Sequence, residues 1–229
     1  MKQTMTERHI NSVHQLRAEQ LKTSTREFKA RGSALKRCPE CLLATDKCIC
    51  NVFEPVDSNI AVCMLMYHAE YYKPSNTGQL ICQMVEDNYA FRWERTKLDQ
   101  ELALLLKNDA YYPIIVFPHD SVDEVRQIDR VPDTEQLSGR KPLLIFLDGT
   151  WRQAKKMFIK SPYLDDIPVL ELKDFTKGAY QLRESYHEHH LSTVEVAYEV
   201  FKQNGEVNLG KQLEKLFVQF RTGYKAYKR

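Results

Sequence analysis

Residues 143–159 read Leu-Leu-Ile-Phe-Leu-Asp-Gly-Thr-Trp-Arg-Gln-Ala-Lys-Lys-Met-Phe-Ile, and this stretch decides the fold class. The apolar run 143–147 is typical of a strand that is buried on both faces of a sheet. A turn at 148–150 follows it, and 151–159 have the character of a helix. A buried strand that leads directly into a helix is the unit from which α/β proteins with parallel sheets are built.

The same alternation of strand and helix continues on both sides of this stretch. Further buried strands are predicted at 60–66, 114–117 and 169–172, and further helices at 11–31, 78–88, 98–107, 193–203 and 209–220. Ser192 and Glu195 have the spacing of a capping box at the start of the 193–203 helix. Residues 120–141 are polar and are expected to form a surface excursion. We therefore expect an α/β fold with a mostly parallel sheet and flanking helices.

Charge is distributed unevenly along the 229 residues, although the formal net charge is only +2. Residues 1–37 hold nine Lys or Arg against three Asp or Glu, and residues 211–229 hold six against one, so the middle of the chain is acidic. Basic ends favour a polyanionic partner such as nucleic acid, and a pair of solvated charged helices is the alternative. No apolar run is long enough to span a membrane, and the polar start lacks a signal-peptide core. We expect a cytoplasmic protein without a membrane partner.

Four of the six cysteines lie close together, as Cys38-Pro-Glu-Cys41 and, after six residues, Cys48-Ile-Cys50. Two close pairs across a short loop allow four thiolates to reach one tetrahedral zinc ion. Disulfides are a weaker interpretation, because a reducing compartment and the one-residue gap between Cys48 and Cys50 both disfavour them. Four thiolates leave no open coordination position, so the sequence predicts a structural Zn²⁺ site.

Three segments follow predicted strands, where parallel sheets bind their ligands. They are residues 67–78, 117–119 and 147–156. The third is the most informative, because Asp148 could accept a proton and Trp151 could stack on a base or an adenine ring. The alternative is that residues 148–150 only cap a helix and that Trp151 lies in the core.

Five motifs, taken in order, resemble the DTW-domain family of the SPOUT-like α/β superfamily. The motifs are the four cysteines 38–50, His68-Ala-Glu-Tyr-Tyr-Lys73-Pro-Ser-Asn76-Thr77-Gly78, Phe117-Pro118, Asp148-Gly-Thr-Trp151-Arg-Gln-Ala-Lys-Lys and His190-Leu-Ser-Thr193-Val-Glu195. The resemblance covers about residues 37–220. The name-giving Asp-Thr-Trp carries an inserted Gly here, a form similar to the bacterial branch. The resemblance implies a SPOUT-like domain with a C-terminal trefoil knot, which is a rare topology.

The resemblance also implies an activity in tRNA modification. Bacterial members similar to this chain are tRNA-uridine aminocarboxypropyltransferases. They transfer the 3-amino-3-carboxypropyl group of S-adenosylmethionine to N3 of a uridine at position 47 in the tRNA variable loop, which forms acp3U and releases 5′-methylthioadenosine. One alternative is a SPOUT-type RNA methyltransferase with the same co-substrate. Another is a zinc-containing RNA-binding protein without catalysis.

Roles for individual residues follow from the resemblance. Asp148 is the candidate catalytic base, and its alternative role is only to position the uracil N3–H or the amino group of the co-substrate. The residues expected to bind S-adenosylmethionine are Phe117, Pro118, Leu147, Asp148, Gly149, Thr150, Trp151, Leu191, Ser192 and Thr193. The residues expected to contact RNA, with ordinary surface charge as the alternative, are His68, Lys73, Arg152, Lys155 and Arg183.

We expect two parts in the chain. Residues 1–55 would form a basic helix and the four-Cys zinc module, which together would bind tRNA. Residues 56–229 would form the SPOUT-like catalytic domain. Many SPOUT enzymes are dimers, whereas the DTW branch is more similar to a monomer, so a monomer is expected and a dimer is the alternative.

Overall fold

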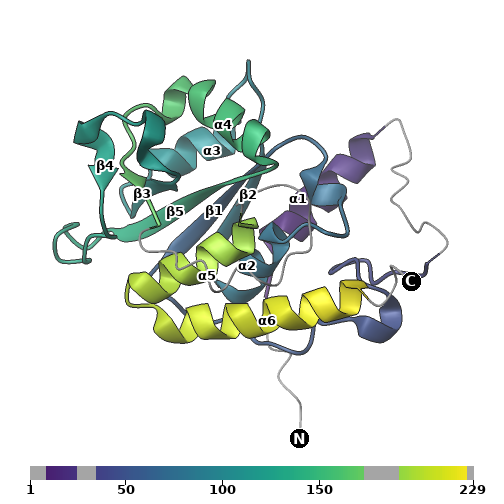
Figure 1. Cartoon of the computed structure of the whole chain (residues 1–229). Helices are drawn as coiled ribbons and strands as arrows, with labels where there is room; N and C mark the ends of the chain where they lie inside the picture. The colour runs from purple at the N-terminus through teal and green to yellow at the C-terminus, as the bar shows by residue number, and fades with distance from the viewer. Residues whose placement is uncertain (1–8, 25–34, 173–190, 226–229) are drawn as a thin grey trace, which may run out of the picture.

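The computed structural model describes residues 9–24, 35–172 and 191–225, which form three layers, with a parallel sheet between two groups of helices (Figure 1). The sheet has the strand order β2-β1-β5-β3-β6-β4, and every neighbouring pair is parallel. The strands are β1 Ala61–Met66, β2 Asn88–Arg92, β3 Tyr111–Val116, β4 Gln127–Ile128, β5 Lys141–Asp148 and β6 Val169–Leu170. The predicted α/β fold is therefore confirmed, and the described sheet is parallel throughout.

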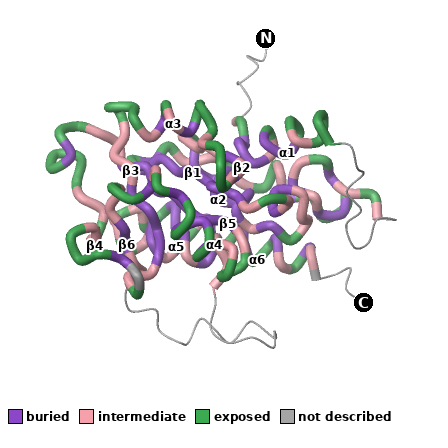
Figure 2. The backbone as a smooth tube through the Cα atoms, turned by 90° about the horizontal axis from the view of Figure 1, so that it is seen from above, coloured by how far each residue is buried: buried purple, intermediate pink, exposed green. Residues whose placement is uncertain are grey.

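Helices cover both faces of this sheet. They are α1 Ser12–Thr23, α2 Gly78–Met84, α3 Gln100–Leu106, α4 Trp151–Ile159, α5 Thr193–Gln203 and α6 Val207–Lys225. Helices α1, α2, α5 and α6 share one apolar core, and α3 and α4 contribute to the other. Figure 2 shows the buried residues along the sheet and on the inner sides of the helices, with exposed residues outside.

Strand β1 shows why the central strands are apolar without interruption. Val62, Met64 and Met66 belong to the core on the α2 side, whereas Cys63 and Leu65 belong to the core on the α4 side. All six residues of the strand are buried. Because successive side chains point to opposite faces, a strand covered on both sides has no polar position.

Two strands were not predicted, and both are edge elements. The helix predicted at 78–88 ends at Met84, because Val85 adopts an extended backbone, and β2 follows at Asn88. In β2 only Phe91 is buried, so the strand carries no continuous apolar run. Strand β4 lies in the polar excursion 120–141 and pairs with β6 over two residues. Both depend on pairing with a neighbour rather than on a local pattern.

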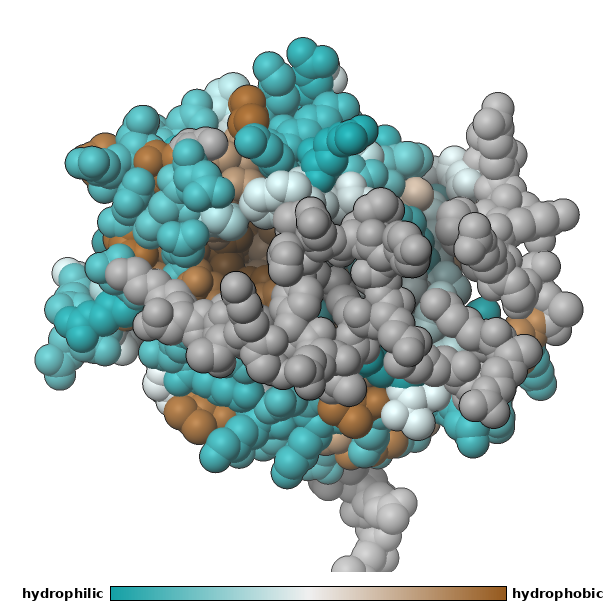
Figure 3. Space-filling view, in the orientation of Figure 1, coloured by the Kyte–Doolittle hydropathy of each residue, from teal (hydrophilic) through white to brown (hydrophobic). Residues whose placement is uncertain are grey.

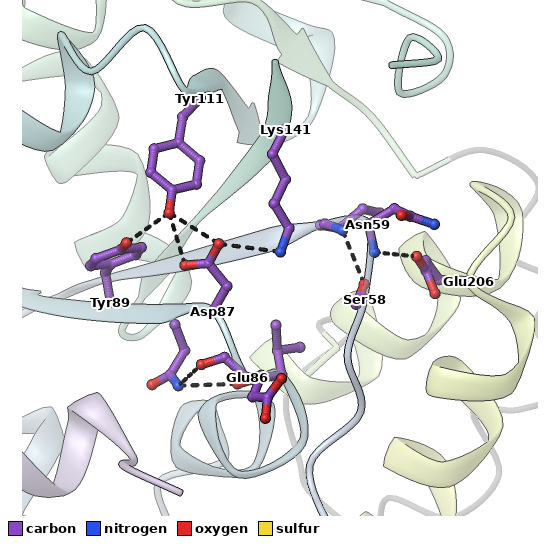
Figure 4. Close-up of polar contacts among 11 residues, drawn as sticks. Ser58, Asn59, Glu86, Asp87, Tyr89, Tyr111, Lys141 and Glu206 are labelled. Carbon is purple, nitrogen blue, oxygen red and sulfur yellow. Dashed lines mark hydrogen bonds and ion pairs between the residues drawn. The ribbon is translucent and has the colours of Figure 1, made fainter. Parts of the chain in front are cut away.

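A polar cluster joins the amino ends of three strands, at the edge of the sheet opposite to the carboxyl ends (Figure 4). The Tyr111 hydroxyl lies 3.0 Å from each carboxylate oxygen of Asp87 and 2.8 Å from the Tyr89 hydroxyl. Lys141 Nζ lies 3.2 Å from Asp87 Oδ2. These contacts connect β2, β3 and β5 to one another, so this cluster is a structural feature of the sheet.

The N-terminal segment shares its core with the sheet domain. Val13 and Leu16 of α1 and Leu43 and Ile49 of the cysteine segment belong to the same core as α2, α5 and α6. The division at residue 55 stays a prediction. The knot also stays an expectation, since it depends on the path of residues 173–190, which lie outside the described residues. Within the described part of the chain, no helix is both long enough and apolar enough to cross a membrane.

Candidate active site and metal centre

Asp148 is the last residue of β5 and lies where three segments meet. Its Oδ2 accepts a hydrogen bond from the Asn76 side-chain amide at 2.5 Å, and its Oδ1 accepts one from the Thr193 hydroxyl at 2.6 Å. Asn76 comes from the segment after β1, and Thr193 is the first residue of α5. Only 4% of Asp148 is exposed. The two hydrogen bonds from Asn76 and Thr193 thus hold the buried carboxylate from both sides, and both donors are neutral.

Burial raises the pKa of Asp148 above its ordinary value, although the hydrogen bonds from Thr193 and Asn76 and the charge of Lys73 oppose this effect. Burial likewise raises the pKa of Glu70. The Lys73 ammonium lies 2.5 Å from Glu70 Oε1 and is the cation near both acids. A carboxylate with a raised pKa is a stronger base than an ordinary one.

Gly78, the first residue of α2, lets the helix approach this carboxylate closely. A Cβ atom at this position would lie 3.1 Å from Asp148 Oδ2 and 2.8 Å from Met64 Cε. Both distances are shorter than ordinary van der Waals contact, so the missing side chain is what permits the arrangement.

A cavity of about 430 Å³ lies beside Asp148, within the range of small-molecule sites. Two of three parallel rings, Phe117 and Trp151, line it, and Phe158 stacks behind Phe117. Phe117 stacks on Trp151, with centroids 5.3 Å apart and planes at 7°, and on Phe158 at 4.5 Å and 9°. Trp151 is 40% exposed, so the alternative that it belongs to the core is wrong. On the face drawn in Figure 3, hydrophobic residues gather in a hollow.

Most of the residues predicted to bind the co-substrate line this cavity. They are Phe117, Pro118, Leu147, Gly149, Trp151, Leu191 and Thr193. The other three do not line it. Asp148 faces Asn76 and Thr193, whereas Thr150 and Ser192 form capping boxes at the starts of α4 and α5. Asp120 and Glu171, two acids of the lining, were not predicted: Asp120 lies just beyond the Phe117-Pro118 motif, and Glu171 follows β6 without any motif around it.

The residues predicted to contact RNA have different surroundings. His68, Arg152 and Lys155 are exposed, and Lys73 is paired with Glu70. Arg183 lies outside the described residues.

Lys156 was not predicted as a site residue, but it lies over two stacked rings. Its Nζ is 5.7 Å from the centroid of Tyr67 and 5.9 Å from that of Trp93. The two rings stack at 5.5 Å. Tyr67 directly follows β1, and its backbone N–H donates to the Asp148 carbonyl. This aromatic and cationic surface therefore lies next to the end of β5.

The four clustered cysteines meet in space, and their Sγ atoms lie within 4.8 Å of one another. Cys38 is 3.5 Å from Cys48 and 3.7 Å from Cys50, and Cys41 is 3.9 Å from Cys48. A tetrahedron with Zn–S bonds of about 2.3 Å has edges of about 3.8 Å, so the donor set fits zinc.

The backbone and charge around the four cysteines also suit a metal. Leu42 adopts a left-handed conformation, with φ of 59°, which turns the chain after Cys41. Arg17 of α1 is buried and donates to the carbonyls of Pro39 at 2.5 Å and of Glu40 at 2.6 Å. Burial lowers the pKa of Arg17, and the charges of three thiolates oppose this effect. A zinc ion held by four thiolates would be anionic, and the buried guanidinium would compensate part of its charge.

The sequence around this site matches a known protein family. A family model described as DTW domain matches residues 35–225. This range contains the four cysteines, the loop of Asn76, the end of β5 and the start of α5. No solved structure matches the chain.

Proposed function

The chain belongs to the DTW domain family, and from this premise we propose that it is a tRNA-uridine aminocarboxypropyltransferase. Membership is consistent with a tRNA-modifying enzyme. One observation carries the finer proposal: a buried carboxylate with a raised pKa lies at the carboxyl end of β5, beside an aromatic-walled cavity. A proton acceptor next to a site for an adenosine derivative is what this transfer requires.

The proposed reaction forms one bond and breaks another. Uridine N3 bonds to the first methylene of the aminocarboxypropyl chain of S-adenosylmethionine while the bond from this methylene to sulfur breaks. The bonding pair stays on sulfur, which yields neutral 5′-methylthioadenosine. The N3 proton leaves with a base. All three carbons on the sulfonium are electrophilic, so the shape of the cavity decides which one faces the nucleophile.

Asp148 is the proposed acceptor of the N3 proton. Neutral uridine is a poor nucleophile at N3, so removal of this proton in the transition state favours the transfer. Burial supports this role, because it raises the pKa of Asp148. Both oxygens already accept hydrogen bonds from Asn76 and Thr193, which also suits the alternative role of positioning.

The cavity is proposed to hold the adenosine and methionine parts of the co-substrate. The exposed ring of Trp151, backed by Phe117, offers a stacking surface for adenine. The acids Asp120 and Glu171 line the same cavity. Their carboxylates would accept hydrogen bonds from ribose hydroxyls or from the ammonium group.

The tRNA is proposed to bind across the rim of this site and the zinc module. His68, Arg152 and Lys155 are exposed near the ends of β1 and β5. The zinc module contacts α6, since a Cβ atom at Gly223 would lie 3.4 Å from Lys47 Cβ. The basic C-terminal helix is thus a neighbour of the cysteine segment. Phosphate contacts from such a surface would make tRNA affinity depend strongly on salt.

The test is mass spectrometry of tRNA nucleosides after incubation with the protein and S-adenosylmethionine. The proposal expects acp3U together with 5′-methylthioadenosine. A methylated nucleoside with S-adenosylhomocysteine would instead identify a methyltransferase. An unmodified tRNA that still binds would identify a non-catalytic RNA-binding protein.

The variant Asp148→Asn tests the base. It should bind S-adenosylmethionine and lose transfer activity by about 10²-fold or more. Full activity in this variant would exclude Asp148 as the base.

A further inference from the structure

Gln79 lies at the meeting point of the zinc module, helix α1 and the loop that supports Asp148. Only 2% of the Gln79 surface is exposed to solvent. The side-chain amide nitrogen donates to the Asn76 carbonyl at 3.0 Å and to the Cys41 carbonyl at 3.4 Å. The side-chain oxygen lies 3.1 Å from the ring nitrogen Nε2 of His14. Every polar atom of this buried side chain therefore has a partner, and the partners come from three separate segments.

These contacts continue to the candidate base. Asn76 Oδ1 accepts from the backbone N–H of Gln79 at 3.1 Å, and Asn76 Nδ2 donates to Asp148. Gln79 thus contacts Asn76 through both its side chain and its backbone. Cys41 is one of the four thiols that fit zinc, and its carbonyl is the other acceptor. A continuous series of hydrogen bonds runs from the cysteine cluster to the carboxylate.

We propose that Gln79 is a positioning residue through which the zinc module and α1 hold Asn76 in place, and thereby set the position of Asp148. This inference rests on the proposed function, because it assigns a role in that reaction. It gives the zinc module a second task besides contact with RNA: the module supports the active site from behind.

The physical reason is the cost of leaving buried carbonyls without donors. If the amide of Gln79 is removed, the carbonyls of Asn76 and Cys41 lose a partner in a region closed to water. The loop then moves to satisfy them, and the Asn76 amide moves with it. Transfer reactions are sensitive to such shifts, since a misplacement of about 1 Å can lower the rate by about 10²-fold.

The pH dependence of the reaction should also change. The hydrogen bond from Asn76 lowers the pKa of Asp148 and so opposes the effect of burial. The charged and titratable groups that act on Asp148 or feel its charge are Lys73, Glu70 and Cys82. None of these is altered by a change at residue 79, so loss of the Asn76 contact should raise the pKa of Asp148.

The test compares Gln79→Met with Gln83→Met, which makes the same exchange one turn further along α2. For Gln79→Met we expect kcat to fall about tenfold or more, KM for S-adenosylmethionine to stay within about twofold, and the acid limb of the kcat profile to move to higher pH. The Gln83→Met variant should match the wild type. Gln79→Leu, which also removes the amide and adds no charge, should behave as Gln79→Met does, so this second variant covers a failure of the first to fold.

A second measurement needs no activity. The Asp148 carboxyl carbon is followed by NMR through a pH titration of the zinc-loaded full chain. Its midpoint should be higher in Gln79→Met than in the wild type and unchanged in Gln83→Met. Equal midpoints in all three proteins, or an equal loss of kcat in both variants, would overturn the inference. A wild type that makes no acp3U would refute the proposed function instead, and the titration would still decide the role of Gln79.

Discussion

Replacing Gly78 with alanine is a sharp test of the Asp148 site, because the added methyl group points at the carboxylate. The new Cβ atom would lie 3.1 Å from Asp148 Oδ2, about 0.3 Å inside the 3.4 Å at which ordinary contact begins. It would also lie 2.8 Å from Met64 Cε, the end of a flexible but fully buried side chain. The Met64 side chain is flexible and can move away from the new methyl group. The contact with Asp148 Oδ2 then remains, and the carboxylate has to shift by a few tenths of an ångström to relieve it.

The substitution should change both the unfolding free energy and the transfer rate. Overpacking destabilises by about 1–3 kcal/mol, and alanine in a helix returns up to about 1 kcal/mol relative to glycine. The net loss of stability is therefore about 2 kcal/mol or less. The hydrogen bonds at Asp148 are short, so a retreat of this size strains both of them. On the scale of about 10²-fold per ångström, a shift of about 0.3 Å should lower the transfer rate by roughly fourfold.

The assay is the initial rate of 5′-methylthioadenosine formation from S-adenosylmethionine and tRNA, with the unfolding free energy measured on the same sample. Gly210→Ala is the control, since its Cβ atom would lie 2.6 Å from Lys202 Cγ and 2.7 Å from the Tyr198 carbonyl, tight contacts between α5 and α6 that involve no residue of the site. It should lose stability without losing turnover per folded molecule. Gly78→Ala with a wild-type rate would refute the argument that the position of Asp148 limits the reaction.

Three further predictions concern separate parts of the molecule. Burial raises the pKa of Asp148, so the wild type should lose stability relative to Asp148→Asn as pH rises from the ordinary carboxyl pKa through the raised value. Denaturant unfolding from pH 4 to pH 8 checks this, and a difference in unfolding free energy between the two proteins that stays constant with pH contradicts it. Trp151→Ala should weaken S-adenosylmethionine binding about fivefold in calorimetry, from the loss of about 1 kcal/mol of stacking, and unchanged affinity would place adenine elsewhere. Cys48→Ser should lose stoichiometric zinc in metal analysis and lower the melting temperature, whereas retained zinc would exclude this ligand.

Local patterns were sufficient for the central strands and for the four cysteines that could hold a metal. Strand β5 was predicted from its apolar run, since a segment without polar positions fits only where both faces are covered. Helix α4 was predicted at 151–159, the bounds that the structure shows, and there Thr150 and Gln153 cap its start. The four cysteines lie within 13 residues of chain, so their short loop brings them together.

The same reasoning missed elements that depend on a neighbour. Strand β2 was not predicted, and the helix predicted at 78–88 ran into its first residue, because the strand lies at the edge of the sheet and buries only one of its residues. Gln79 was read as one polar residue of a helix, and no motif singled it out. Its role depends on three partners from other segments.

What the sequence determined by itself was therefore the composition of the site: an aspartate after a buried strand, an aromatic residue at a helix start, and four thiols in one loop. Only the tertiary structure decided which groups hold the aspartate. Asn76 and Thr193 are 72 and 45 residues away from Asp148 in the chain. They meet it because β1 and β5 are parallel neighbours and α5 begins at the same edge. Contacts across such separations are set by strand order, which has no signature in the local sequence.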